Sequence, residues 1–400
     1  YERMLASPFA FLRGSAAVMI QDIASSPTTG ISVQACGDMH VSNFGVFASA
    51  ERNLVFAIND FDETYPGAWE WDIKRLVTSA IAAGRHLKAD KTLCEEAVRA
   101  TLQSYRQHLH EYAQMSYLEL WYAQIEEAEL LKKLPDEQQQ KAARILAKAR
   151  ERTHLQTLDK LTELVNEQQQ IIESPPLVIR AETLSDGRSI VEALKELIQS
   201  YFASIGSDRR FLLSRYRIVD VARKVVGVGS VGTRCWVVYL EGKDRNDPLF
   251  LQIKEAQSSV LAPYAESFQE GRAFSSHEGE RVVIGQRLIQ GAPDIFLGWG
   301  NLSGIDYYLR QLRDMKGGIK LEPGKFRPKN LPDYCGLCGW ALALAHAKSG
   351  DAAMLAGYVG KSEALDDAMV QFARAYADQT EQDYDRLVQA AKQGRILATS

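Results

Sequence analysis

The chain has 400 residues, of which 46% are hydrophobic and 24% charged, and its formal net charge is −4. This length exceeds what one hydrophobic core usually supports, so we expect two or three lobes. Scattered basic residues and a slightly negative charge argue against nucleic acid as a partner, and no apolar run of about 18 residues predicts a membrane-spanning helix.

The five cysteines are an odd and sparse set, at positions 36, 94, 235, 335 and 338. Such a set suits a reducing compartment better than a disulfide framework. No secretory signal opens the chain. We therefore expect a cytoplasmic protein.

The first quarter of the chain mixes helices with short strands. Residues 7–25 have helical spacing and start at a Ser-Pro pair. The apolar run 31–37 ends in glycine and predicts a strand, whereas 44–49 and 53–60 flank a polar turn and predict a hairpin. Residues 69–86 predict an amphipathic helix.

Helical patterns dominate the next part of the chain, and strands follow them. Residues 136–170, rich in Gln, Lys, Ala, Glu and Leu, predict a long helix or a pair of helices. After about residue 210 the pattern is strand, glycine-rich turn, strand, followed by a strand at 248–256, a helix at 277–290 and an extended segment at 305–315. Helical patterns return from residue 332 to the end.

These patterns predict an α+β fold in three parts. Residues 1–213 form a helical part that carries the acidic motifs, residues 214–318 form a β-rich part, and residues 319–400 form a helical part that packs on the first.

A glycine-rich motif joins the first two strands of the β-rich part. Gly227, Gly229 and Gly232 form a G-x-G-x-x-G pattern that includes Ser230. A dinucleotide-binding unit needs a helix directly after this pattern, but the following TRCWVVYLEG has strand character. A glycine loop between antiparallel strands fits a flap over nucleotide phosphates instead, because its backbone N–H groups approach oxygens without side-chain clash.

Lys254 ends the next apolar strand, 22 residues beyond Gly232. A lysine at a strand end is usually a surface residue with an apolar-packed stem. One strand beyond the glycine loop, however, its ammonium group can reach the α- and β-phosphates of a nucleotide. We expect a carboxylate to hold it, with Glu280 as the first candidate and Glu278 as the alternative.

Two acidic motifs, CGDMHVSN and NDFDE, lie close together near the start of the chain. Phosphoryl transfer needs an acid that accepts or orients the hydroxyl proton, and oxygen ligands for Mg²⁺. Asp38 suits the role of the base, and Asn43 and Asp60 suit the metal. Asp62 is an auxiliary metal ligand in this interpretation, although Asp62 and Glu63 also suit the capping of a turn.

The same motifs resemble those of known phosphotransferases. GDMHVSN resembles the catalytic loop of aminoglycoside and choline kinase-like enzymes, whose pattern is HGDxHxxN, and NDFDE is similar to their metal-binding segment. WDIKRL resembles the segment whose acid, here Asp72, braces the catalytic loop. The resemblance implies a structural role for His40. Cys36 departs from the first His of the pattern, a residue that usually supports the geometry of the loop.

The order of the motifs differs from that in kinases. The glycine loop and LQIKEA resemble the protein kinase N-lobe, but here they follow the catalytic loop instead of preceding it. The resemblance therefore implies a kinase-like fold that is circularly permuted. From SPFAFLRG to AHAKSGD, the whole chain also resembles a bacterial family labelled only as domain of unknown function 2252.

The sequence thus predicts an ATP- and Mg²⁺-dependent phosphotransferase that acts on a hydroxyl group of a small molecule. Two alternatives stay open: a pseudokinase that binds nucleotide and regulates a partner, and a metal-dependent hydrolase that uses the Asp/His/Asn cluster alone. We expect the helical block at 100–210 to contact the acceptor. No pattern indicates an oligomeric state.

Overall fold

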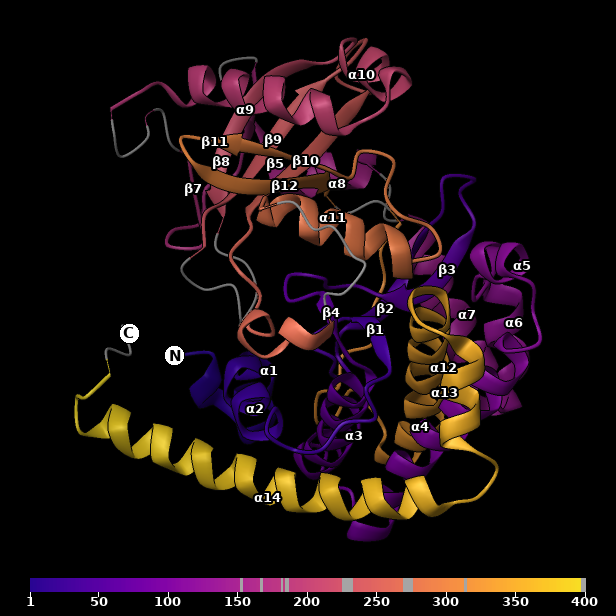
Figure 1. The fold of residues 1–400 in the computed structure, drawn as a ribbon. Helices are drawn as coiled ribbons and strands as arrows, with labels where there is room; N and C mark the ends of the chain where they lie inside the picture. Colours follow the sequence, from indigo (N-terminus) through magenta and orange to yellow (C-terminus); the bar gives the residue numbers. More distant parts are fainter. Residues whose placement is uncertain are drawn as a thin grey trace.

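The computed structural model describes residues 1–151, 154–165, 168–180, 183, 187–224, 233–268, 276–312 and 315–396. The chain forms a sheet-rich upper lobe and a mainly helical lower lobe in the view of Figure 1. Helices and antiparallel sheets together confirm the α+β class.

The upper lobe is built on an antiparallel sheet with the strand order β11-β12-β10-β9-β8-β7. Helices α9 and α10 cover its outer face, so the lobe begins before residue 214, where the sequence placed the boundary. Its elements are α8 (His154–Leu161), β5 (Thr162–Val165), β6 (Gln168–Ile171), β7 (Val178–Arg180), α9 (Ile190–Ser204), α10 (Ser207–Leu213), β8 (Arg217–Lys224), β9 (Cys235–Glu241), β10 (Pro248–Glu255), η2 (Ala262–Tyr264), η3 (Glu266–Phe268), α11 (Glu278–Ile289), β11 (Gly298–Leu302) and β12 (Ile305–Gln311).

The central strand β10 shows why one face of the sheet is apolar and the other partly polar. Successive side chains of a strand point to opposite faces. Leu249, Leu251 and Ile253 belong to the core shared with α9 and α10. Gln252 and Lys254 alternate with them and are buried on the inner face, which looks toward the lower lobe.

In the lower lobe the helices α3, α4 and α12 pack on one another, and the largely buried α3 and α12 also contact two short strand pairs. No helix in the described ranges is long and apolar enough to cross a membrane. The elements of this lobe are η1 (Met4–Ala6), α1 (Pro8–Gly14), α2 (Ala16–Ile23), β1 (Ser32–Ala35), β2 (Phe44–Ala48), β3 (Leu54–Ile58), β4 (Tyr65–Ala68), α3 (Trp69–His86), α4 (Lys91–Tyr112), α5 (Tyr117–Tyr122), α6 (Glu127–Lys133), α7 (Asp136–Glu151), η4 (Pro328–Asn330), α12 (Leu331–Ser349), α13 (Ala352–Val359) and α14 (Ala364–Lys392).

Two predicted helical stretches differ in the structure. The helix predicted at 7–25 is divided into α1 and α2 at Ser15. Residues 162–165 and 168–171 form the antiparallel strands β5 and β6 instead of helix. The backbone N–H of Ile171 donates to Asp220 Oδ2 at 2.7 Å, and its side chain joins the core on the inner face of the sheet. Docking against β8 therefore outweighs the local helical preference.

The contact between α4 and α12 depends on a glycine. A Cβ atom on Gly339 of α12 would lie 2.1 Å from the backbone oxygen of Thr101 in α4, so the two helices approach too closely for any side chain. Gly336, one turn earlier, leaves ordinary van der Waals space for a Cβ atom, at 3.7 Å from the nearest atom.

We expect Gly339→Ala to lower the free energy of unfolding by about 1–3 kcal/mol, because overpacking forces the helices apart. The matched control Gly336→Ala should be neutral or stabilising by up to about 1 kcal/mol, because alanine favours a helix over glycine. Urea denaturation of both variants measures the difference. Equal effects from the two substitutions would contradict the close helix contact.

Candidate functional site

The predicted catalytic loop, residues 36–43, is held at its start by Asp72. The Asp72 carboxylate accepts the backbone N–H of Cys36 at 2.7 Å and that of Gly37 at 3.0 Å. Asp72 is 1% exposed and lies in the first turn of α3, where the helix dipole favours a negative charge. The predicted bracing role of Asp72 is confirmed.

A buried histidine supports the same carboxylate. His346 of α12 places Nε2 3.3 Å from Asp72 Oδ2 and Nδ1 2.7 Å from the hydroxyl of Tyr105. Cys36 occupies the position where the kinase pattern has histidine, and burial together with the Asp72 carboxylate raises the pKa of its thiol. An imidazole from a distant helix thus lies beside Asp72, a contact that no local pattern predicts because the two residues are 274 positions apart.

Asp38, the predicted base, is oriented by an arginine that the sequence analysis missed. Arg75 Nε donates to Asp38 Oδ1 at 2.7 Å, and another guanidinium nitrogen of Arg75 donates to the backbone oxygen of Leu12. His40 Nε2 lies 3.8 Å from Asp38 Oδ2. Burial lowers the pKa of His40 to about 4, so this imidazole is neutral at pH 7. The signal for Arg75 was its position three residues after Asp72, on the same helix face.

The predicted metal ligands Asn43 and Asp60 are brought together by the hairpin β2–β3. The backbone N–H of Asn59 donates to the backbone oxygen of Asn43 at 2.8 Å. Asn43 Nδ2 donates to the backbone oxygen of Asp38 at 2.6 Å, which ties the end of the catalytic loop to its beginning. Asp60 Oδ1 accepts the backbone N–H of Asp62 at 3.3 Å.

Lys254 reaches across from the upper lobe and forms an ion pair with Asp62. Tyr308 of β12 donates its hydroxyl to the other carboxylate oxygen of Asp62 at 2.7 Å. Burial opposes the charge on Lys254, but Tyr308, Asp62 and Asp60 outweigh it and raise the pKa of the lysine. Lys254 therefore carries its charge although it is only 4% exposed.

The expected pairing of Lys254 with a glutamate of α11 is wrong in this structure. Glu278 bonds to Arg281 and to Ser258, and Glu280 lies half-buried in the first turn of the helix. The carboxylate beside Lys254 comes from the NDFDE segment instead. A pairing between lobes cannot be read from spacing along the chain, because the partners are 192 residues apart.

Arg281 of α11 forms a second connection between the lobes. Its guanidinium donates to the backbone oxygens of Thr64 at 2.6 Å, Asp62 at 2.9 Å and Gln257 at 2.7 Å. The side chain is 3% exposed, so these are desolvated, charge-assisted bonds. They fix the backbone that follows the predicted metal-binding segment against the upper lobe.

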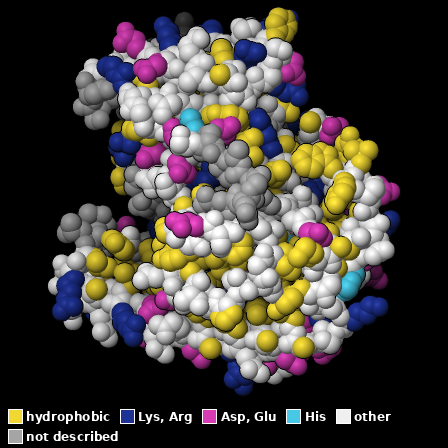
Figure 2. All heavy atoms as spheres, viewed as in Figure 1, with side chains coloured by type: hydrophobic (Ala, Val, Ile, Leu, Met, Phe, Trp, Pro, Cys, Tyr) yellow, Lys and Arg dark blue, Asp and Glu magenta, His cyan; other side chains and the backbone are white. Residues whose placement is uncertain are grey.

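Two polar cavities lie beside this junction. The larger, of about 540 Å³, lies between the hairpin β2–β3, the inner face of the sheet and α11. On the face shown in Figure 2, charged side chains also gather where the two lobes meet. The charged residues that line the larger cavity, within the described part of the chain, are Arg52, Lys224, Asp294, Arg310 and Lys316.

The smaller cavity, of about 420 Å³, shares Asn59 and Lys316 with the larger one. Ser42 of the loop 36–43 and Lys160 of α8 also line it. Among its described lining residues the charged ones are both lysines. The two cavities together follow the boundary between the lobes, next to the catalytic loop.

The predicted glycine loop, with Gly227, Gly229, Ser230 and Gly232, lies outside the described residues. Its two flanking strands are present: β8 and β9 pair antiparallel, and β9 pairs with β10 so that Cys235 lies opposite Lys254. The end of β8 and the start of β9 therefore lie at the same end of the sheet as Lys254.

The comparisons with known proteins identify a family. A family model described as "Uncharacterized protein conserved in bacteria (DUF2252)" matches residues 1–390. The chain belongs to this family. The whole-chain resemblance noted in the sequence is thereby confirmed. Searches of curated proteins and of solved structures returned no significant match.

Glu63 gives the site a measurable dependence on pH. Its Oε2 accepts the backbone N–H of Val260 at 2.8 Å, and burial raises its pKa from 4.5 to about 7. Between these values the folded chain holds a proton that the unfolded chain has released. Stability contributed by the protonated carboxyl is therefore lost as the pH rises from about 4.5 through 7.

We expect the parent protein to lose about 2–3 kcal/mol of unfolding free energy between pH 5 and pH 8 relative to Glu63→Gln, which carries no titrating group at this position. Urea midpoints at both pH values measure this difference. The control Glu51→Gln, at an exposed glutamate in the β2–β3 turn, should follow the parent. Parallel pH profiles for all three proteins would show that Glu63 is not protonated in the fold.

Proposed function

We propose that the protein is an ATP- and Mg²⁺-dependent phosphotransferase with a permuted kinase-like fold, acting on a hydroxyl group of a small molecule. The observation that carries the proposal is the ion pair between Lys254 and Asp62. It joins the strand after the glycine motif to the acidic segment after the catalytic loop. The pair joins two segments, 192 residues apart in the chain, that carry residue types required for phosphoryl transfer.

The upper lobe supports a kinase-like arrangement. In protein kinases a glycine-rich loop joins the first two strands, and the anchoring lysine lies on the third. Here β8, β9 and β10 are neighbours in this order, Lys254 lies on β10, and α11 follows before β11 and β12. Lys254 would anchor the phosphates from the inner face of this sheet.

The junction between α12 and β1 supports the permutation. The backbone N–H of Gln34 in β1 donates to the hydroxyl of Ser349 at 3.1 Å. A Cβ atom on Gly350 would lie 2.9 Å from the backbone oxygen of Ser32. The end of α12 therefore lies against the start of the catalytic strand, so a chain in kinase order would pass directly from one to the other.

The catalytic roles follow from the contacts. Asp38 would accept the proton of the acceptor hydroxyl, with its carboxylate oriented by Arg75. Asn43 and Asp60 would hold Mg²⁺, which neutralises charge on the phosphates when bound. The donor set fits, because Mg²⁺ takes one or two carboxylates and completes its shell with water and phosphate oxygens. Asp62 is bonded to Lys254 and Tyr308, so we assign it to holding the lysine.

Among the described residues, no cluster of three or more His, Cys, Asp or Glu side chains could hold a metal ion. The proposed pair of Asn43 and Asp60 does not need a third acid. The nucleotide would occupy the larger cavity, where four of the five charged lining residues named above are basic. The acceptor would enter the smaller cavity, which is bounded by Ser42 and by α8 from the helical block at 100–210.

The second candidate is a pseudokinase. It is favoured by one observation: Lys254 pairs with Asp62 and not with a glutamate of α11, the pairing that active kinases use. The hydrolase alternative is less well supported, because it assigns no role to the buried ion pair of Lys254.

ATP with Mg²⁺ should raise the thermal midpoint of the parent protein, since a ligand at 100 times its dissociation constant adds about 2.7 kcal/mol. Asp60→Ala should lose the Mg²⁺-dependent part of this shift. Asp385→Ala, at an exposed acid on α14, is the control and should retain it. No response of the parent to any nucleotide would overturn the proposal.

Asp38→Asn separates the enzyme from the pseudokinase. The variant should keep the midpoint shift with ATP and Mg²⁺ but lose about 100-fold or more of the rate of ADP release in a mixture of small hydroxyl compounds. Equal rates in variant and parent would refute Asp38 as the base. Nucleotide binding by the parent with no ADP release would favour the pseudokinase.

A further inference from the structure

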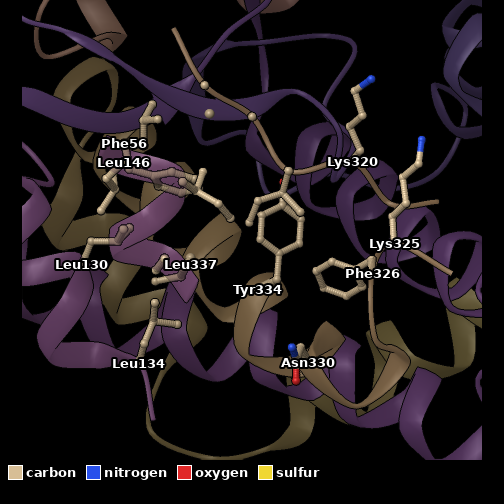
Figure 3. Close-up of a pocket in the computed structure, with 17 residues that line it drawn as sticks. Phe56, Leu130, Leu134, Leu146, Lys320, Lys325, Phe326, Asn330, Tyr334 and Leu337 are labelled. Carbon is tan, nitrogen blue, oxygen red and sulfur yellow. The ribbon is translucent and has the colours of Figure 1, made fainter. Parts of the chain in front are cut away.

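An apolar pocket of about 230 Å³ lies in the lower lobe, separate from the polar cavities between the lobes. Figure 3 shows side chains of α6, α7, β3 and α12 converging on it. We propose that this pocket binds the alkyl chain of a medium-chain carboxylate, with the carboxylate group held at its basic rim. The proposal does not depend on the phosphotransferase function.

Several walls of the pocket are buried apolar side chains, which offer little to a polar ligand. Phe56, Leu130, Leu146 and Leu337 line it and are each less than 9% exposed, so packing behind them fixes their positions. The hydroxyl of Tyr334, which also lines the pocket, is already committed to the backbone oxygen of Val41 at 2.6 Å. A ligand of this interior must therefore be mainly apolar.

The rim supplies positive charge. Lys320 and Lys325 line the pocket, and Figure 3 shows their ammonium groups directed away from the apolar side chains. The segment 316–330 that carries them has five basic residues and one acid, Glu322. Glu322 forms an ion pair with Lys325 and also interacts electrostatically with Lys320, so the two lysines share one acid. The charge at the rim therefore favours an anionic head group.

The volume of the pocket limits the length of the alkyl chain that it can hold. A methylene group occupies roughly the volume of a water molecule in the liquid, ~30 Å³, so the pocket holds a chain of about eight carbons. Burial of each methylene adds about 0.8 kcal/mol, which is roughly a fourfold gain in affinity. Affinity should therefore rise with chain length and then stop rising once the pocket is full.

The first test is calorimetric titration with hexanoate, octanoate, decanoate and dodecanoate below their micellar concentrations. We expect roughly a fourfold increase in affinity per methylene up to about eight carbons and little gain beyond. The proposal would be overturned if none of the four carboxylates bound, or if the affinity kept increasing fourfold per methylene up to dodecanoate.

A matched pair of variants locates the site. Ala142 lines the pocket, and its neighbour Ala143 on α7 is exposed and does not line it. Ala142→Phe should fill the pocket and weaken octanoate binding at least tenfold, whereas Ala143→Phe should leave it unchanged. Octanoate binding that is the same in both variants would place the ligand elsewhere.

The head group is tested separately. Lys320→Gln should weaken octanoate several-fold and leave octanol unaffected, and Lys148→Gln, at an exposed lysine of α7, is the control. Octylamine should bind more weakly than octanoate. Equal binding of octylamine, or flotation with anionic phospholipid vesicles that Ala142→Phe abolishes, would overturn the assignment to a free carboxylate.

Discussion

The site depends first on one face of helix α3. Asp72, Arg75 and Ser79 follow each other at helical spacing, and each bonds to the loop 36–43. Asp72 holds the backbone at the start of the loop, Arg75 binds the Asp38 carboxylate, and Ser79 accepts another backbone N–H. A buried loop has few other ways to satisfy its polar groups, and each charge-assisted bond contributes about 1.5–3 kcal/mol. The helix therefore fixes both the backbone and the acid that the proposed chemistry requires.

The second constraint is the burial of two cations from the upper lobe. Lys254 and Arg281 are almost fully buried, and both find their partners in the segment 60–64 of the lower lobe. A buried charge without a partner costs several kcal/mol. The ion pair and the charge-assisted hydrogen bonds therefore hold the two lobes together where the acidic motif ends, and they place β10 and α11 against the segment 60–64.

The segment that leads from β12 toward α12 separates two kinds of cavity. Residues 317–319 line the smaller polar cavity on one side and the apolar pocket on the other. Gly317 pairs with Val46 of β2, and a Cβ atom on Gly45 would lie 2.5 Å from the Gly317 oxygen. Such a close backbone contact requires glycine, and it keeps the proposed acceptor site distinct from the proposed alkyl-chain site.

The sequence by itself determined the local structure and the chemical inventory. Hydrophobic periodicity located β1, the hairpin β2–β3, the helix at 69–86 and the strands around Lys254, because burial of one face imposes that period. The resemblance of WDIKRL to a kinase-like segment also indicated Asp72 as a brace. Only the tertiary structure decided that Asp62 pairs with Lys254, that Arg75 orients Asp38 and that 162–165 and 168–171 are paired strands. These outcomes depend on desolvation and on contacts between segments that are distant in the chain, and local sequence does not encode which charge meets which.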